Sequence, residues 1–500
     1  MPEEYILKVT DVSKSFAGVK ALNKVHLEIK PGEIHCLAGE NGCGKSTIIK
    51  VISGVYTMDE GVVEFSGKQY TEITPREAIM NGIQVIYQDF SIFPNLTVME
   101  NLAYNTELAE KKKFVNWKRM REIAQKAAGN IDFKVDLNTL VGDLSVADKQ
   151  LVAISRALMH GAKLIIMDEP TTALTKKEVT ALFKIILDLQ KQGIAVLFVS
   201  HKLDEVFEIS ERFTIMRNGE NVITCNADEL DDKKFSYYMT GREFESKFFE
   251  PANVSAEPVL EVRDLSMENG FYNVDFDLRK GEILGITGLL GSGRTELALA
   301  LFGLHKTDSG TIMVHGKPAE FTSVQKAMKE NIGYLPEDRL TEGLFLSRSI
   351  ADNITVSEVD NLTRGAGFWD DAKRQSEVDK WVADLKIATK NPENAANTLS
   401  GGNQQRIVLA RWLATHPDIL IMNGPTVGVD IGSKHDIHET LHNLANNGMA
   451  IIIISDDIPE VIRNCSRVLL MKAGKITGEV NPREISENQL AEMMTSSDAS

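Results

Sequence analysis

Short apolar runs alternate with amphipathic segments along this chain. The runs at 164–167, 195–199 and 450–454 are four or five residues long and rich in Ile, Val and Leu, and each is followed by a helical pattern. Buried strands that alternate with helices are typical of an α/β fold with a mainly parallel sheet. Alternating strands ahead of each Gly-rich turn predict an antiparallel β region. A helix-rich insert is expected at about 90–160 in the first half.

The whole pattern occurs twice. The segment 7–68 returns as 260–317, and Gly39 of the first copy corresponds to Gly288 of the second. A period of about 250 residues indicates a duplicated domain and not a solenoid, whose repeats are far shorter. The chain is therefore expected to consist of two α/β domains.

A polar segment separates the two copies. Residues 243–257 contain Pro251 and show neither a strand nor a helix periodicity, as expected of a linker. The predicted organisation is a first domain at 1–243, a linker at 244–257 and a second domain at 258–500.

The composition is that of a globular protein in the cytosol. Of the 500 residues, 43% are apolar and 25% are charged, which is ordinary for a soluble domain. No segment reaches the roughly 18 consecutive apolar residues needed to cross a bilayer. The N-terminal sequence MPEEYILKVT has neither the basic nor the apolar region of a secretory signal.

Charge and cysteine content narrow the possible partners. The net charge of −16 argues against a broad nucleic-acid surface, because phosphate binding depends on clustered Lys and Arg. The four cysteines show no CxxC pair and no metal-ligand spacing, so we expect reduced, mostly buried thiols. No nucleic-acid partner and no cysteine metal site are predicted.

A phosphate-binding loop follows the predicted strand 34–38. Its sequence matches GxxxxGK[ST], in which glycines let backbone N–H groups wrap a phosphate. Lys45 is expected to reach the β and γ oxygens, and the hydroxyl of Ser46 to bind Mg²⁺. The residues predicted to bind ATP here are Gly39, Asn41, Gly42, Gly44, Lys45, Ser46 and Thr47.

Two carboxylates end the apolar strand that begins at Leu164. Asp168 is expected to hold Mg²⁺ and Glu169 to polarise the attacking water as the catalytic carboxylate. Acidic residues can also simply end a strand. The lysine loop upstream and Pro170-Thr171 directly downstream favour the functional interpretation.

The order of these motifs resembles that of ABC ATPases. Gln88 follows a strand, LSVADKQ stands at 144–150, and His201 follows VLFVS. The resemblance implies that Gln88 touches Mg²⁺ and couples to a membrane partner, and that His201 contacts the γ-phosphate as a second catalytic residue. It also implies that Phe16 stacks on adenine, although a core aromatic residue would fit that position nearly as well.

The second half carries related but altered motifs. Arg294 stands where the loop lysine belongs, and a planar guanidinium does not replace a compact ammonium. Asn423 and Gly424 take the places of the two carboxylates, Asp456 that of the histidine and Glu337 that of the glutamine. This site is expected to bind nucleotide poorly or to hold it without turnover. Its loop residues are Gly288, Gly291, Gly293, Arg294 and Thr295.

The signature loops show the reverse pattern. The second half has LSGGNQQ at 399–405, whereas in the first half Val146 and Ala147 replace the two glycines and Asp148 adds a negative charge nearby. In the ABC family each ATP lies between the phosphate loop of one domain and the signature loop of the other. The resemblance therefore implies one complete site, to which the second half contributes Ser400, Gly401, Gly402 and Gln404.

The whole chain resembles the tandem ATPase subunits of bacterial monosaccharide importers of the ribose, galactose and xylose type. The fused halves, the Arg294 loop, and the segments PEDR at 336–339 and PTVGVD at 425–430 carry this resemblance. Those proteins usually keep an acidic pair where this chain has Asn423 and Gly424. The departure makes turnover at the second site doubtful.

The resemblance also implies partners and a location. Two permease subunits and an extracytoplasmic solute-binding protein are expected, with this chain peripheral at the cytoplasmic face of the inner membrane. Related importers carry nucleosides, inositols or a furanosyl signal molecule, so the cargo stays open. The alternatives are a soluble tandem-ABC translation factor, against which the short linker and the charge of −16 argue, and a non-hydrolysing scaffold.

Overall fold

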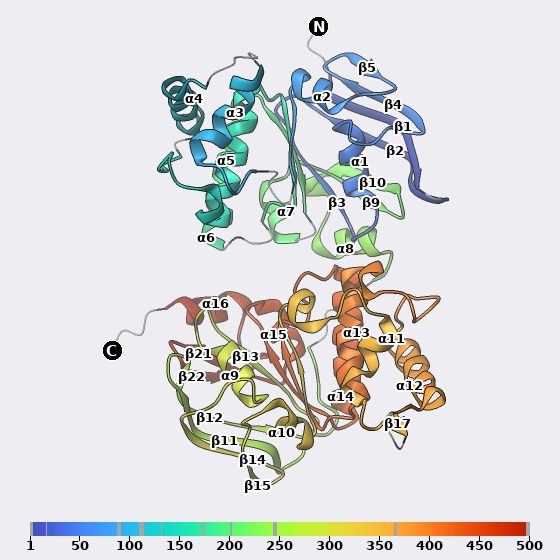
Figure 1. Cartoon of the computed structure of the whole chain (residues 1–500), viewed down its shortest axis with the longest axis vertical. Coiled ribbons are helices and arrows are strands. Elements are labelled where there is room, and N and C mark those ends of the chain that lie inside the picture. Colours follow the sequence, from blue (N-terminus) through green and yellow to red (C-terminus); the bar gives the residue numbers. More distant parts are fainter. Residues whose placement is uncertain are drawn as a thin grey trace. The chain divides into compact units, whose positions relative to one another are not determined.

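The chain forms two compact units, residues 1–244 and 245–500, which are treated separately below. In Figure 1 the first runs from blue to green and the second from yellow-green to red. Each unit has a mainly parallel core sheet, an antiparallel sheet and a helical insert, so the predicted tandem α/β fold is confirmed. The computed structural model describes residues 4–16, 18–87, 92–109, 115–131, 133–171, 174, 176–200, 203–243, 248–364 and 368–496.

The core sheet of the first unit carries its phosphate loop. Among the described strands, those other than β10 run parallel, and β10 is antiparallel at one edge. β7 and β8 are covered on both faces, which explains why their sequences are continuous apolar runs. The order is β10 (Glu220–Asn226), β9 (Arg212–Arg217), β3 (Ile34–Gly39), β8 (Ala195–Val199), β7 (Leu164–Asp168) and β6 (Ile83–Ile86).

An antiparallel sheet and a helical insert complete the first unit. They lie on opposite sides of the core sheet in Figure 1. The sheet has the order β2 (Val19–Ile29), β1 (Leu7–Phe16), β4 (Glu60–Phe65) and β5 (Lys68–Tyr70). The helices are α1 (Lys45–Ile52), α2 (Pro75–Asn81), the insert helices α3 (Val98–Ala109), α4 (Trp117–Gly129) and α5 (Val146–Met159), then α6 (Lys176–Lys191), α7 (Leu203–Ile209) and α8 (Asp232–Thr240), with short η1 (Val141–Asp143) and η2 (Ala227–Glu229).

The sheets of the second unit repeat this plan. Its antiparallel sheet has the order β12 (Phe271–Arg279), β11 (Pro258–Met267), β14 (Ser309–Val314) and β15 (Lys317–Ala319). Its core sheet has the order β16 (Ile332–Leu335), β19 (Ile419–Asn423), β20 (Ala450–Ile454), β13 (Ile283–Thr287), β21 (Arg467–Lys472) and β22 (Lys475–Val480). Strands β17 (Thr363–Arg364) and β18 (Phe368–Trp369) form a small hairpin.

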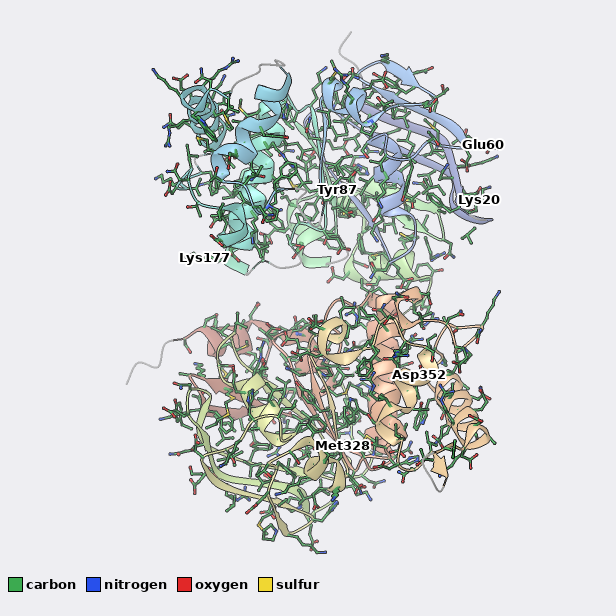
Figure 2. All side chains as sticks on the ribbon, viewed as in Figure 1. Lys20, Glu60, Tyr87, Lys177, Met328 and Asp352 are labelled. Atoms are coloured by element: carbon green, nitrogen blue, oxygen red, sulfur yellow. The ribbon has the colours of Figure 1, made fainter. Side chains whose placement is uncertain are left out.

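The helices of the second unit also follow the plan of the first. The insert is built from α11, α12 and α13, beside the core sheet in Figure 1, and side chains fill the space between sheet and helices (Figure 2). The helices are α9 (Arg294–Leu301), α10 (Val324–Lys329), η3 (Arg339–Gly343), α11 (Ile350–Thr355), η4 (Val356–Glu358), α12 (Asp371–Asp384), η6 (Ala396–Thr398), α13 (Gly401–Ala414), α14 (Ile431–Asn446), α15 (Ile458–Asn464) and α16 (Glu487–Thr495).

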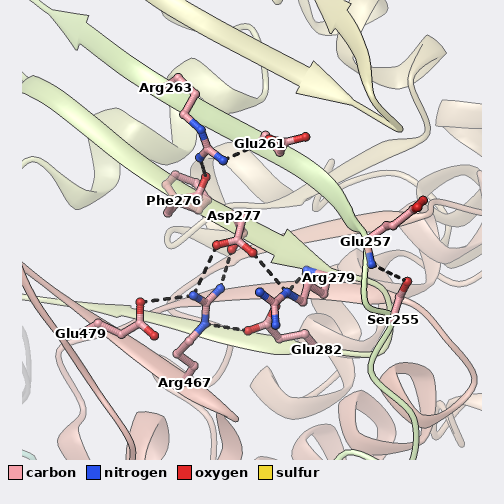
Figure 3. A network of polar contacts seen from close by, with 10 residues as sticks. All are labelled: Ser255, Glu257, Glu261, Arg263, Phe276, Asp277, Arg279, Glu282, Arg467 and Glu479. Atoms are coloured by element: carbon pink, nitrogen blue, oxygen red, sulfur yellow. Dashed lines mark hydrogen bonds and ion pairs between the residues drawn. The ribbon is translucent and has the colours of Figure 1, made fainter.

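One arginine ties the two sheets of the second unit together. Arg467, the first residue of β21, lies 2.9 Å from Glu282 and 3.2 Å from Glu479, and also pairs with Asp277 of β12 (Figure 3). Burial lowers the pKa of Arg467, but the charge and hydrogen bond of Glu282, together with the charges of Glu479 and Asp277, outweigh burial and raise the pKa above its usual value. Because Glu282 directly precedes β13, this network fixes the strand that leads into the second phosphate loop.

Two further expectations concern the thiols and the membrane. All four cysteines are free and buried, as predicted. Within the part of the chain that the structure describes, no helix combines the length and the apolar character that a membrane crossing requires.

Candidate nucleotide sites

The first phosphate loop lies between β3 and α1, where the chain turns sharply. Gly39, Gly42 and Gly44 have φ values of 153°, 81° and 108°. A Cβ at Gly39 would clash with Cys43 Sγ and a backbone carbonyl, and one at Gly44 would lie 2.8 Å from a carbonyl oxygen. Helix α1 begins after Gly44 without a side-chain cap, so its first N–H groups are open to an anion.

Lys45 is folded into the curve of this loop. Its ammonium donates to the carbonyls of Gly39 at 2.6 Å and Glu40 at 3.0 Å, and the side chain is almost fully buried. Among the described residues it forms no ion pair with a carboxylate. Its charge is therefore balanced by carbonyl dipoles and is available to a bound anion.

Asp168 and Glu169 lie where β7 ends. Burial, and then the charge of Glu169, raise the pKa of Asp168, while the nearby ammonium groups of Lys45 and Lys50 lower it. Glu169 has a φ of 48°, and its N–H donates to the Val199 carbonyl at 2.9 Å. A left-handed backbone costs a residue with a side chain about 1–2 kcal/mol, and such strain often marks functional sites.

Three other predicted residues bear on the nucleotide. Gln88 and His201 lie outside the described residues. Phe16 is 39% exposed, so it is not a core residue, and its ring packs edge-on against Tyr56 at 5.1 Å between centroids. Lys14 lies 5.7 Å above the same ring. Phe16 is thus held on two sides while keeping the exposure that stacking on a base requires.

The donor set suits a hard cation. Ser46 is exposed in the first turn of α1, and Asp168 is a partly buried carboxylate whose charged form burial disfavours. Among the described residues, no group of three or more His, Cys, Asp or Glu side chains could hold a metal ion. Mg²⁺ does not need such a cage, because one or two carboxylates and the phosphates of the nucleotide suffice.

The second phosphate loop keeps the backbone but changes the cation. Gly291 and Gly293 have φ values of 79° and 94°, and a Cβ at Gly288 would lie 2.7 Å from Ser292 Oγ. Arg294 is buried like Lys45 and donates to the Gly288 carbonyl. Its other terminal nitrogen lies 3.2 Å from Asp456 Oδ2, so a carboxylate of the same unit already neutralises this cation.

Asn423 and Gly424 reproduce the end of β7 without its charges. Gly424 has a φ of 59°, and its N–H donates to the Ile454 carbonyl at 2.8 Å, as Glu169 does to Val199. Burial raises the pKa of Tyr334 to about 12, against the effect of a hydrogen bond with the buried Asn423 side chain. The polar group that replaces Asp168 is thus satisfied by a tyrosine.

The two signature loops differ in how their helices begin. In the first unit Ser145 caps α5 by accepting from the Asp148 N–H at 3.1 Å, and its hydroxyl donates to the Asp148 carboxylate at 2.8 Å. In the second unit Ser400 does not cap α13 with its side chain and accepts instead from Asn403 Nδ2 at 3.0 Å. The second helix therefore starts without a side-chain cap, whereas in the first helix the Ser145 hydroxyl occupies one N-terminal amide and the Asp148 carboxylate adds a negative charge beside it.

Packing inside the second unit also requires the signature glycines. A Cβ at Gly402 would clash with the Ser433 hydroxyl, and one at Gly401 would lie 2.7 Å from Arg339 Nη2. Arg339 donates to the carbonyls of Val427 at 2.7 Å and Gly428 at 3.1 Å. The sequence pattern did not identify the packing role of Ser433 or Arg339, because both act through contacts with residues far away in sequence.

The remaining predicted residues take up simple positions. Gln404 is buried, and its amide donates to the Leu399 carbonyl at 3.1 Å, so in this structure it holds the signature loop. Asn41 is exposed in the first phosphate loop. Thr47 and Thr295 are half-buried in the first turns of α1 and α9. Contacts of these four residues with ATP stay predictions.

Comparisons with known proteins identify the repeat. The family model described as ABC transporter matches residues 22–172 and 271–427. A putative ribose/galactose/methyl galactoside import ATP-binding protein of Geobacillus kaustophilus is 39% identical over 99% of this chain and 98% of its own length. Ribose import ATP-binding proteins of Bacillus licheniformis and Clostridium perfringens are 38% and 40% identical, each over 98% of this chain and over 99% and 98% of their own lengths.

Proposed function

Because this chain belongs to the ABC transporter family, we propose that it is the ATP-hydrolysing subunit of a membrane importer for a monosaccharide or a related small polar solute. The names of the full-length relatives support the sugar class. The proposal of hydrolysis depends on three residues that lie near one another at or just beyond the ends of β3 and β7, namely Lys45, Asp168 and Glu169. They are close enough that the charge of Glu169 raises the pKa of Asp168 and that of Lys45 lowers it.

Each residue of the first site has a proposed role. The loop amides and Lys45 bind the β and γ phosphates, and Phe16 supports the base. Asp168, Ser46 and Gln88 would hold Mg²⁺, which neutralises phosphate charge when bound. Glu169 orients the attacking water and accepts its proton, and His201 contacts the γ-phosphate. The open helix start at Ser400, Gly401 and Gly402 is proposed to complete this site, as the family resemblance implies.

We propose that an exposed phenylalanine of each unit contacts a permease subunit. Phe93 is 48% exposed and lies shortly after Gln88, and its ring is 5.9 Å from that of Tyr104. Asn101 is buried and makes two hydrogen bonds with the Phe93 backbone, accepting from its N–H at 2.9 Å and donating to its carbonyl at 2.9 Å. The exposed ring is therefore presented on a rigid support.

The second unit repeats this support. Phe345 is 56% exposed, and Asn353 binds its N–H at 2.9 Å and its carbonyl at 3.0 Å. Arg411 donates to the carbonyl and the side-chain oxygen of Asn353, both at 2.8 Å. Two equivalent rings suit two permease subunits, with the chain peripheral at the cytoplasmic face of the membrane and a solute-binding protein on the other side.

The partner proposal is tested by charge substitution. Phe93→Asp and Phe345→Asp place a carboxylate in an apolar contact and should weaken co-purification with the permease while ATP binding persists. Leu187→Asp is the matched control, because Leu187 is also an exposed apolar residue of the first unit but lies on α6, outside the segments that carry the two phenylalanines. Unchanged co-purification of both phenylalanine variants would refute these docking residues.

The cargo proposal needs the assembled importer. Vesicles that contain the permease, this chain and the solute-binding protein should hydrolyse ATP faster when the cognate sugar is present. A panel of pentoses, hexoses, inositols and nucleosides would identify the cargo. Stimulation by a nucleoside alone would overturn the sugar class but leave the ATPase proposal standing.

A further inference from the structure

A single carboxylate joins the two catalytic segments of the first unit. Thr171, two residues after Glu169, donates its hydroxyl to Glu205 Oε2. Ser200, the residue before His201, donates its hydroxyl to the same oxygen at 3.3 Å. Thr171 is only 1% exposed and Ser200 only 2%, so both hydroxyls are buried, whereas Glu205 is half-buried.

The same junction occurs in the second unit. Thr426 Oγ1 donates to Glu460 Oε1 at 2.6 Å, and Ser455 also hydrogen-bonds to Glu460. Burial alone would raise the pKa of Glu460, but its hydrogen bond with His438 and the charge of that ring bring it down to about 2. The arrangement therefore belongs to the fold and keeps a carboxylate at this point in both units.

A backbone contact adds to the junction in the first unit. The Glu169 N–H donates to the carbonyl of Val199, which directly precedes Ser200. The segment 169–171 is thus attached to the end of β8 at two points, once through the backbone of Glu169 and once through Thr171 and Glu205. The second attachment fixes the position of Thr171, two residues beyond the left-handed turn at Glu169.

We propose that Glu205 is a positioning residue, which holds Thr171, in the loop after Glu169, at a fixed distance from Ser200, the residue that precedes His201 in the sequence. This inference rests on the proposed function. The two hydroxyl donors to Glu205, those of Thr171 and Ser200, lie close in sequence to the predicted catalytic residues and belong neither to the phosphate loop nor to the predicted metal ligands. Loss of Glu205 should therefore impair the chemical step and leave ATP binding through Lys45 intact.

The test measures kcat and KM for ATP in the assembled transporter. Glu205→Ala and Thr171→Val should each lower kcat about 10- to 100-fold, the effect of misplacing a reacting group by about an ångström, and change KM less than threefold. Thr171→Ser keeps the hydroxyl and should retain most of the activity. The double variant should lose no more than the worse single variant, because both remove one junction.

A matched control separates positioning from folding. Thr426→Val removes the equivalent hydroxyl from the second unit and should lower Tm without lowering kcat per folded molecule. If kcat of Glu205→Ala and Thr171→Val falls only in proportion to the folded fraction, the positioning role is wrong. Glu169→Gln distinguishes this result from a failure of the proposed function, because only that failure would leave the Glu169→Gln rate unchanged.

Discussion

The segments that follow β7 in the first unit and β19 in the second have the same backbone conformation but carry different side chains. Glu169 and Gly424 adopt the same left-handed conformation and make the same hydrogen bond to the next strand. In the first unit this geometry carries a carboxylate in spite of its strain. In the second unit it is occupied by glycine, for which the conformation is free of strain. At this position only the first unit carries backbone strain, because Glu169 has a side chain and Gly424 does not.

Two altered residues of the second half-site, and the serine of the first signature loop, have partners within their own unit. Arg294 pairs with Asp456, Asn423 with Tyr334, and Ser145 with Asp148. The intact counterparts Lys45 and Ser400 keep donors that a phosphate could use. A polar group that is not expected to contact the nucleotide therefore has a partner within its own unit. This is expected because a buried polar group without any partner is costly.

The largest effect should come from the catalytic carboxylate. Glu169→Gln should keep ATP binding and lower turnover by about two to four orders of magnitude, the contribution of a general base. Asn423→Ala changes the last residue of β19, which corresponds to Asp168. This substitution should leave turnover within about twofold, because the segment that follows β19 has no catalytic carboxylate. The measurement is phosphate release by the assembled transporter. A Glu169→Gln variant that turns over at the wild-type rate would remove the asymmetry on which the comparison depends.

The second-largest effect on turnover is expected from substitutions in the signature loops. Gly402→Asp should lower turnover at least about a hundredfold, whereas Ala147→Asp in the other loop should have a far smaller effect. Repulsion of the γ-phosphate is one reason, but the clash with Ser433 is another that acts within the unit. Equal losses from the two variants would show that the loops do not differ in function.

A double substitution separates these two causes. Ser433→Gly removes the two atoms that a Cβ at Gly402 would clash with, Ser433 Oγ and Ser433 Cβ, and leaves Asp430 Oδ2 at an ordinary contact distance of 3.4 Å. If packing alone matters, Gly402→Asp with Ser433→Gly should recover turnover. If the carboxylate repels ATP, the double variant should fold, as judged by Tm, and stay inactive. Recovery would contradict a phosphate contact at this glycine.

The cations of the two phosphate loops should differ in ATP affinity. Lys45→Ala should weaken binding about 10- to 150-fold, the equivalent of one or two charged hydrogen bonds at about 1.5–3 kcal/mol. Arg294→Ala should change binding little, because Asp456 already occupies its guanidinium. Equilibrium dialysis gives both the affinity and the number of ATP molecules bound per chain. Two ATP molecules bound to the wild-type chain with equal affinity would contradict the expectation that the second site binds nucleotide poorly.

Local patterns predicted the elements well because the determinants of a buried strand are local. The run 164–167 became β7 (Leu164–Asp168), and 34–38 became β3 (Ile34–Gly39), each one residue longer than expected. The repeat located the altered residues by correspondence. It did not reveal the pairing of Arg294 with Asp456, because contacts between residues about 160 positions apart leave no local pattern.

The junction at Glu205 shows a second reason why sequence patterns do not identify every functional residue. Thr171, Ser200 and Glu205 recur in the second half at the same offset as the catalytic motifs, so the repeat contained the signal. Such residues are common in loops and helix starts, and only the hydrogen bonds distinguish them from ordinary caps. Phosphate-loop residues can be recognised by type and spacing, whereas positioning residues are recognised by what they touch.

The smallest expected effect concerns the contribution of one position, that of His442, to acid stability. Burial, and then the charge of His438, lower the pKa of His442 from its usual 6.5 to about 4. Its Nε2 has no hydrogen-bond partner among the described residues, and its ring stacks on Phe249 with centroids 4.7 Å apart. The equivalent residue of the first unit is Leu187, which does not titrate.

The sign of this effect follows from the lowered pKa. The folded second unit binds fewer protons than the unfolded chain between pH 6.5 and 4, so the stabilisation from neutral His442 is complete above about pH 6.5 and is lost as the pH falls towards 4. His442→Phe keeps the stacked ring and removes the titration. Tm of the variant should therefore fall less than that of the wild type between pH 7 and 5. The difference should be only a few degrees, since a unit of this size shifts by about 2–4 °C per kcal/mol. Parallel Tm curves for the two proteins would show that His442 is not the residue that makes the second unit sensitive to acid.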